Sequence, residues 1–291
     1  MSIASFAPQM CGVNRLAGEV GACGAAAELR IGRAALHSWD EPVISGQNGS
    51  GTVFFSHCNL DCVFCQNQMI SHGGQGRSTS VPELAGHFLR LQAEGAHNVN
   101  LVTAGHYLPH VAAALRLAKK QGLTLPVVYN CGGYERMESL RRLDGLVDVY
   151  LPDLKYVSPY WSGLYSGAAD YFDYASTAVD EMLRQVGGLE VSGGLMRRGV
   201  IVRHLMLPGL LGDTKAVLRY IAAHWRERVY VSLMRQYTPV AKLPRFPDLN
   251  RTVTDEEYAE AVAELADLGI SMGFLQDGEA IGESFIPEFW G

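Results

Sequence analysis

Three cysteines lie close together in the first quarter of the chain, at a spacing that suits metal chemistry. They are Cys58, Cys62 and Cys65, and they place three thiols within one short loop. Thiolates are preferred ligands of soft metals and of iron–sulfur clusters. A cubane cluster takes four ligands, so three cysteines would leave one iron open to a substrate. The spacing therefore predicts a [4Fe–4S] cluster with one open iron.

Two simpler interpretations of these cysteines are weaker. A structural zinc site usually has paired cysteine knuckles and closes at four ligands, and here His57 or His72 would have to supply the fourth. Buried, inert cysteines are common singly, but three at this spacing are not expected by chance. We therefore favour the cluster over zinc and over a purely structural role.

The segment that precedes the cysteines resembles the first unit of an alternating strand–helix fold. Residues 52–56 (TVFFS) form an apolar, strand-like run that ends directly at the cysteine loop. Such runs alternate with helical patterns along the chain, which is typical of a mostly parallel sheet. Further strands are expected at residues 98–103, 126–129, 146–151, 200–206 and 229–234, with a short one at 270–275. Active sites collect at the carboxyl ends of parallel strands, where the cysteine loop is expected to lie.

Capping residues mark where several helices should begin. Ser80 with Glu83, and Thr254 with Glu257, have the spacing of a capping box, in which each residue's side chain bonds to the other's backbone. Asp213 is expected to cap the helix that follows the fifth strand. These signals indicate where the helix of a strand–helix unit begins after its strand.

The number of units limits the fold. Six strand–helix units are too few to close an ordinary eight-stranded barrel. The sequence therefore predicts an α/β fold, a partial (β/α)6 TIM-like barrel of residues 52–291, with a short N-terminal extension, residues 1–51, packed on the barrel. A doubly wound sheet is the alternative, because periodicity does not separate the two.

The composition gives no sign of a nucleic-acid or membrane partner. The formal net charge is −6 and the 24 Lys and Arg residues are scattered, so no basic patch for nucleic acid is expected. No apolar stretch is long enough to span a bilayer, and residues 1–9 lack the pattern of a signal peptide. We therefore expect a cytoplasmic protein, in which clustered cysteines bind metal more often than they form disulfides.

The cysteine spacing after the first strand resembles that of the radical SAM superfamily. The wider string GQNGSGTVFFSHCNLDCVFCQN, residues 46–67, is similar to the PflX-like branch, whose members are named after pyruvate formate-lyase activating enzymes. The resemblance extends over nearly the whole chain, through the segments NLVTAGHYLPH, PVVYNCGGYE, VDVYLPDLKY, VRHLMLPG and LMRQYTP. It implies a partial barrel, a [4Fe–4S] cluster and S-adenosylmethionine, whose amino and carboxylate groups chelate the open iron.

The same resemblance implies an activity. The cluster would cleave S-adenosylmethionine reductively to a 5′-deoxyadenosyl radical, which abstracts hydrogen from a protein, peptide or small-molecule substrate. In one version the substrate is a glycyl radical enzyme that becomes activated. A low-potential electron donor such as flavodoxin or ferredoxin would be needed. The alternative functions are a non-catalytic iron–sulfur protein for electron transfer or sensing, and a zinc-binding scaffold.

Some candidate contacts to S-adenosylmethionine follow from the resemblance near the first two strands. Phe64 corresponds to an aromatic residue that lies against the adenine, and its alternative role is core packing. Thr103 and His106 follow the second strand, where many superfamily members have a Gly-Gly-Glu motif for the cofactor ammonium. This chain departs from that motif, so the contact is assigned to the segment, and His106 could instead be a structural hydrogen-bonding residue.

The remaining candidates follow later strands. Asn130 precedes a Cys-Gly-Gly segment that could either approach a ligand or form a tight turn. Asp153 and Lys155 resemble the Asp-x-Lys of glycyl-radical activating enzymes, near the ribose and carboxylate of the cofactor. Arg203 lies in an apolar strand and should need an anion or a carboxylate, while Gln236 is a candidate contact for adenine or ribose.

The N-terminal extension carries two further cysteines, Cys11 and Cys23. Relatives often have an additional cysteine pair before them, where this chain has Ala4 and Ala7. Two thiolates do not complete a four-thiolate metal site. We therefore expect no metal at this position.

Overall fold

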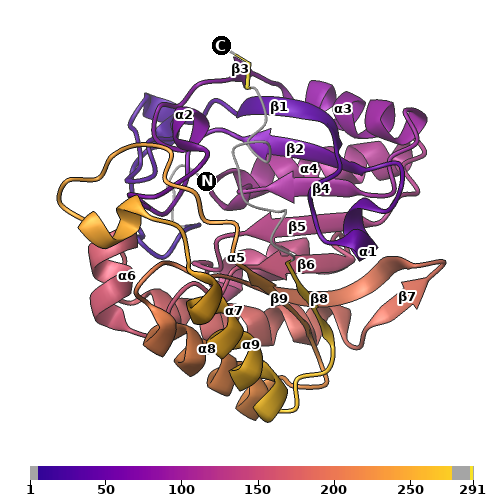
Figure 1. The fold of residues 1–291 in the computed structure, drawn as a ribbon. Coiled ribbons are helices and arrows are strands. Elements are labelled where there is room, and N and C mark those ends of the chain that lie inside the picture. The colour runs from indigo at the N-terminus through magenta and orange to yellow at the C-terminus, as the bar shows by residue number, and fades with distance from the viewer. Residues whose placement is uncertain (1–5, 277–288, 291) are drawn as a thin grey trace.

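The computed structural model describes residues 6–276 and 289–290. Within that part of the chain, one sheet forms the centre of the molecule, in the order β10-β9-β8-β6-β5-β4-β2-β1-β3, with β7 paired to β8 (Figure 1). The strands are β1 Arg30–His37, β2 Ser50–Phe55, β3 Arg77–Ser78, β4 Val99–Val102, β5 Val127–Cys131, β6 Val149–Pro152, β7 Glu190–Ser192, β8 Leu195–Leu205, β9 Tyr230–Met234 and β10 Gly273–Leu275.

The strand order distinguishes the two predicted architectures. Strands β2, β4, β5, β6, β8 and β9 run parallel and follow the chain in order, so each new strand joins the same edge. A doubly wound sheet would instead reverse its order at a switch point. The predicted partial TIM-like barrel is therefore confirmed, and the doubly wound alternative is wrong. All six predicted strands are present, and β10 adds the short strand expected near residue 270.

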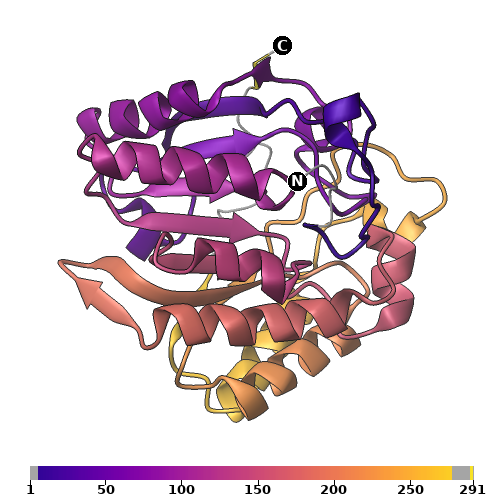
Figure 2. The ribbon, with the colours of Figure 1, turned by 180° about the vertical axis from the view of Figure 1, so that it is seen from behind.

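Helices cover the outer face of the sheet, with α3, α4, α7 and α8 along it (Figure 2). The α-helices are α1 Pro42–Ser45, α2 Gln68–Ser71, α3 Val81–Ala93, α4 Leu108–Lys120, α5 Met137–Leu140, α6 Pro159–Ser166, α7 Tyr171–Val186, α8 Leu211–His224 and α9 Asp255–Asp267. Short 3-10 turns occupy η1 Arg15–Ala17, η2 Gly105–Tyr107, η3 Arg141–Leu143 and η4 Pro247–Asn250. Of the helices described, none is long and apolar enough to cross a membrane.

Both predicted capping boxes are confirmed. At the start of α3 the Ser80 hydroxyl accepts from the Glu83 N–H (3.3 Å) and the Glu83 carboxylate accepts from the Ser80 N–H (2.7 Å). Thr254 and Glu257 form the same pair of bonds at the start of α9. Each box satisfies two backbone donors that the helix itself leaves unpaired.

The prediction that Asp213 caps α8 is wrong. The helix begins two residues earlier, with Leu210 at the N-cap, so Asp213 already lies inside the first turn. Its carboxylate accepts instead from the backbone N–H groups of Val157 (3.3 Å) and Ser158 (2.9 Å), which precede α6. The side chain thus joins two helices that only the tertiary structure brings together.

A strand before residue 52 was not expected. Strand β1 pairs antiparallel with β2, and its Gly and Ala residues give it a low strand propensity, which explains why the sequence pattern missed it. After β1, the fully buried Ile44 of α1 packs with Val128 and Val149 at the amino-terminal side of the parallel strands. The division between an extension, residues 1–51, and a barrel stays a prediction, although residues 30–37 belong to the same sheet.

Candidate functional site

The cysteine loop leaves the carboxyl end of β2 and is fixed by backbone hydrogen bonds to two short helices. The His57 N–H donates to the carbonyl oxygen of Ile70 in α2 (2.8 Å), and the Val63 N–H donates to that of Tyr165 in α6 (2.9 Å). His57 has a φ of 71°, in the left-handed region that residues other than glycine rarely occupy. This sharp turn places the loop across the end of the sheet.

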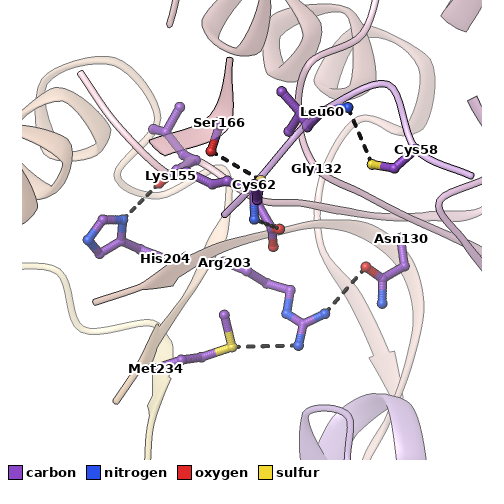
Figure 3. Close-up of polar contacts among 12 residues, drawn as sticks. Cys58, Leu60, Cys62, Asn130, Gly132, Lys155, Ser166, Arg203, His204 and Met234 are labelled. Carbon is purple, nitrogen blue, oxygen red and sulfur yellow. Dashed lines mark hydrogen bonds and ion pairs between the residues drawn. The ribbon is translucent and has the colours of Figure 1, made fainter. Parts of the chain in front are cut away.

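Each of the three loop sulfurs has a hydrogen-bonding group next to it, and Figure 3 shows those of Cys58 and Cys62. The groups are the Leu60 N–H for Cys58 (3.4 Å), the Ser166 hydroxyl for Cys62 (3.1 Å) and the Ser71 hydroxyl for Cys65 (3.3 Å). Donors of this kind stabilise negative charge on sulfur, which a metal-bound thiolate carries. The loop is therefore suited to hold thiolates as well as thiols.

Burial sets the protonation of these groups when nothing is bound. Desolvation raises the pKa of the Cys62 thiol to about 11, although the nearby Lys155 ammonium opposes that rise. Desolvation also raises the pKa of Cys58 above its usual value. The Cys58 and Cys62 thiols are therefore protonated at neutral pH, and binding of a metal group would release their protons.

A cavity of about 220 Å³ lies beneath the cysteine loop at the carboxyl ends of the strands. It brings together ten of the eleven residues that the sequence predicted for the site. These are Cys58, Cys62, Phe64, Cys65, Thr103, Asn130, Asp153, Lys155, Arg203 and Gln236. Residues that lie as far apart in the sequence as Cys58 and Gln236 thus line one cavity, as expected for the functional edge of a parallel barrel.

Asp153 and Lys155 form an ion pair on the cavity wall. The Lys155 ammonium donates to Asp153 Oδ2 at 2.6 Å, and both side chains are mostly buried. Burial by itself would lower the pKa of Lys155, but Asp153 and Cys62 reverse this and raise it above its usual value. Gly133, with a φ of 79°, lets the chain pass under this pair, since a Cβ there would overlap the Asp153 carbonyl oxygen.

Arg203 lies in β8 with its guanidinium in the cavity, where it has the carboxylate that the sequence led us to expect. The partner is Glu41, with 3.1 Å between Arg203 Nε and Glu41 Oε1. Arg203 also donates to Asn130 Oδ1 (3.3 Å) and approaches Met234 Sδ (3.5 Å), as Figure 3 shows. Glu41 is the N-cap residue of α1 but makes no side-chain capping bond.

Three other predicted contacts line the cavity in different ways. Phe64 is largely buried and packs edge-on against Tyr237, so it has a structural contact as well as a face toward the cavity. Thr103 has a φ of 60°, which is strained for a β-branched residue and is typical of functional positions. The Gln236 side chain is fixed by a hydrogen bond from Gln276 (2.6 Å).

His106 is not brought to the cavity. Its ring is almost fully buried, with Nε2 2.7 Å from the Ser56 carbonyl oxygen, and burial lowers its pKa to about 3. Its own carbonyl oxygen accepts from Arg15 of the extension (2.7 Å). The observed geometry is that of the structural hydrogen-bonding alternative.

The sequence missed several residues that line the lower part of the cavity. They are His37, Trp39 and Asp40 at the end of β1, together with Thr52 and Phe54 of β2. The first three depend on a strand that the sequence pattern did not reveal. The alternation of side chains along β2 could have indicated the last two, because Thr52 and Phe54 share one face of that strand.

The cysteine loop fits a cluster better than it fits a single ion. Among the residues that the structure describes, no three His, Cys, Asp or Glu side chains converge closely enough to hold one metal ion. A cubane cluster makes a different demand, because each cysteine binds its own iron and the sulfurs stay apart. The three thiols of the loop line one cavity, and the Lys155 ammonium near Cys62 could balance part of the charge of a bound cluster.

No family model matches the chain. An uncharacterized protein of Methanocaldococcus jannaschii (MJ0674) is 31% identical over 239 residues, which cover 80% of this chain. The chain spans 65% of the length of that relative.

Several solved structures share this fold at low sequence identity. A radical SAM methyltransferase from Sphaerobacter thermophilus has a TM-score of 0.55 at 14% identity, over 82% of this chain and 70% of that one. SuiB of Streptococcus suis, bound to its precursor peptide SuiA, gives 0.53 at 10% identity over 76% and 46%. Methylornithine synthase (PylB) gives 0.52 at 14% over 75% and 60%. At these identities the likeness shows that the chain shares their fold.

Proposed function

We propose that this protein is a radical SAM enzyme, which binds a [4Fe–4S] cluster and cleaves S-adenosylmethionine reductively. The observation that carries the proposal is that one cavity brings the three loop cysteines together with polar residues from the ends of five other strands. A cluster that only transferred electrons would not need a polar cavity beside it. The shared fold is consistent with the proposal but does not establish it, because one fold supports many activities.

The residues of the cysteine loop would hold the cluster. Cys58, Cys62 and Cys65 each supply one thiolate, and the hydroxyls of Ser71 and Ser166 donate to two of the sulfurs. When bound, the cluster supplies a low-potential electron and an open iron for the amino and carboxylate groups of S-adenosylmethionine. The burial of Cys62 and its neighbours keeps bulk water away from this position.

Polar residues of the strand ends would orient S-adenosylmethionine. Lys155 can balance the cofactor carboxylate, and Asp153 can accept from the ribose hydroxyls. The two already face each other at 2.6 Å, so a bound cofactor would exchange part of that ion pair for charge-assisted contacts of its own. Phe64 could pack its ring against the adenine, and Gln236, Asn130 and Arg203 offer further polar contacts in the same cavity.

The molecule that receives the radical is a separate part of the proposal. It would be a protein, peptide or small molecule, with a glycyl radical enzyme as one version. The protein SuiB, similar in fold, is bound to a peptide, and another similar protein is named a methyltransferase, so fold likeness favours no substrate. A flavodoxin or ferredoxin as electron donor, and a cytoplasmic location, belong to the same proposal.

Anaerobic reconstitution tests the function directly. Purified protein is loaded with iron and sulfide, its iron and labile sulfide are counted, and S-adenosylmethionine is added with dithionite as reductant. We expect about four irons per chain, because one [4Fe–4S] cluster contains four. We also expect 5′-deoxyadenosine, because the open iron would bind S-adenosylmethionine for reductive cleavage. A stable cluster that yields no 5′-deoxyadenosine would support the non-catalytic alternative, and stoichiometric zinc without a cluster would support the scaffold.

A further inference from the structure

The cavity extends in two levels from the cysteine loop toward the amino-terminal side of the sheet. The upper level holds the cysteines with Asp153 and Lys155, and the lower one holds His37, Trp39 and Asp40. The sheet register places Thr52 beside Asn100, two residues before Phe54 along the strand. Two residues of a strand span about 7 Å, so Asp40, which bonds to Asn100, lies at least one level away from the cysteine loop.

Asp40 is held in place before any ligand arrives. Asn100 donates its side-chain N–H to Asp40 Oδ2 (3.0 Å), and the Asp40 backbone N–H donates to the Ser45 hydroxyl (3.0 Å). The Ser45 hydroxyl in turn lies 3.3 Å from the Asp40 carbonyl oxygen. Asn100 thus holds the carboxylate and Ser45 holds the Asp40 backbone, and both partners are neutral groups.

The charges in the cavity do not balance at Asp40. Lys155 is paired with Asp153, and Arg203 with Glu41. In the described part of the chain, Asp40 has no ion pair, and the hydrogen-bond donor that its carboxylate meets is a neutral amide. His37 supplies no charge either, because burial lowers its pKa to about 4. The lower level therefore has a surplus negative charge.

A carboxylate in such a place is costly unless a cation joins it. Burial raises the pKa of Asp40 to about 6, and the more distant Arg203 only partly offsets this. At neutral pH the group is still mostly ionised, so a positive group in contact with it would gain a charge-assisted hydrogen bond. The Trp39 and Phe54 rings beside it provide apolar surface for an alkyl stem and a face for a cation.

We propose that Asp40 and Trp39 form a recognition subsite for a cationic group, an alkylammonium or alkylguanidinium, of the molecule on which this enzyme acts. Trp39 is 54% exposed while Asp40 lines the cavity, so the pair spans the path from solvent to the lower level. The substrate role of that molecule rests on the proposed function, whereas binding of a cation needs only the cavity. The loop thiolates would bind the cluster, so Asp40 is the anionic group that would pair with the cationic group of the ligand.

Binding of small probes to anaerobically reconstituted protein with S-adenosylmethionine tests the subsite. The probes are n-butylamine and n-butylguanidine, both cationic at pH 7.5, and the neutral n-butanol of similar shape, each titrated by ligand-observed NMR. The variants are Asp40→Asn, which removes the charge and keeps the shape, and Asp267→Asn, an exposed carboxylate at the end of α9, as a matched control.

We expect the wild type and Asp267→Asn to bind the two cations at least tenfold more tightly than n-butanol. In Asp40→Asn this preference should fall by about ten- to a hundredfold, the size of one charge-assisted hydrogen bond. Equal binding of cation and alcohol by the wild type would overturn the inference without any variant, and so would an unchanged preference in Asp40→Asn. A tenfold loss of S-adenosylmethionine affinity in Asp40→Asn would also overturn it, by assigning the carboxylate to the cofactor.

The two proposals fail in different ways. Absence of 5′-deoxyadenosine from the wild type contradicts the radical chemistry, whatever the probes do. Absence of a charge preference in a wild type that forms 5′-deoxyadenosine contradicts the cationic subsite alone.

Discussion

The two groups of cysteines in this chain differ in whether their surroundings suit them to bind a cofactor. Cys58, Cys62 and Cys65 line a cavity at the carboxyl edge of the sheet, where a cation and several polar strand ends face them. Cys11 and Cys23 lie in the extension on either side of Gly21, and neither lines that cavity. Cys23 accepts a hydrogen bond from Arg15 (3.1 Å), whose other nitrogen holds the His106 carbonyl oxygen.

The difference between the groups is one of surroundings more than of spacing. The loop cysteines have a space next to them that a cofactor could occupy, whereas Cys23 has a structural arginine that ties the extension to the barrel. Ala7 supplies no further thiol to these two cysteines, and Ala4 lies outside the described residues. We therefore expect substitutions of the loop cysteines to abolish cluster binding, and substitutions of Cys11 and Cys23 to leave it unchanged.

The largest effect should come from a loop cysteine. Cys62→Ala removes one of three cluster ligands, so the absorbance of the reconstituted cluster and the formation of 5′-deoxyadenosine should both be lost. The matched control is Cys131→Ala, because Cys131 also lines the cavity but lies on β5, outside the loop. A full cluster in Cys62→Ala, or its loss in Cys131→Ala, would contradict the assignment of ligands.

A smaller effect is expected where the cavity meets the cofactor. Lys155→Met and Asp153→Asn each remove a charge-assisted contact worth roughly 1.5–3 kcal/mol, so the affinity for S-adenosylmethionine should fall about ten- to a hundredfold. Cluster content should stay near that of the wild type. Titration of S-adenosylmethionine into the reconstituted variants measures this, and unchanged affinity in both would remove the pair from the binding site.

Glu135 shows that burial alone does not place a group in the site. It is buried under the end of β4, it does not line the cavity, and its Oε1 accepts from the Tyr129 hydroxyl (3.2 Å). Burial raises its pKa to about 8, from about 4.5 in the unfolded chain. Between those values the folded protein holds a proton that the unfolded chain has released, so this group makes stability fall as pH rises.

Glu135→Gln should remove that loss. From pH 6 to pH 7 the wild type should lose about 1.4 kcal/mol of unfolding free energy relative to the variant, the amount that one pKa unit represents. Urea unfolding of both proteins without cluster at the two pH values measures the difference in their unfolding free energies. The contribution of histidine titration is the same in both proteins and cancels in this difference. A difference that does not change with pH would mean that Glu135 is already ionised in the folded state.

The smallest effect is expected in the extension. Cys11→Ala and Cys23→Ala should leave cluster content and 5′-deoxyadenosine formation unchanged, because neither thiol reaches the cavity. Metal analysis of reconstituted protein should show no second stoichiometric site. Zinc or additional iron that disappears on substitution of Cys11 would make the two groups of cysteines more alike than we propose.

Much of the site could be predicted from the sequence because it depends on local order. The cysteine spacing, the apolar strand before it and the capping residues are each set by neighbours along the chain. Asn130, Asp153, Lys155 and Arg203 were assigned from the family resemblance and from their places at strand ends, and polar residues at the ends of parallel strands meet at one edge. The partial barrel followed in the same way from six successive strand–helix units.

The tertiary structure alone decided which side chains complete that edge. Asp40 lines the cavity and Glu41 pairs with Arg203 because β1, a strand of low propensity, joins the sheet beside β2 and leads the chain to this position. His106 turns away because the Ser56 carbonyl oxygen lies within 2.7 Å of its ring. Asp213 bonds to another helix because its own helix begins earlier. Pairings of this kind join residues distant along the chain, and periodicity, which reports only on neighbours, has no signal for them.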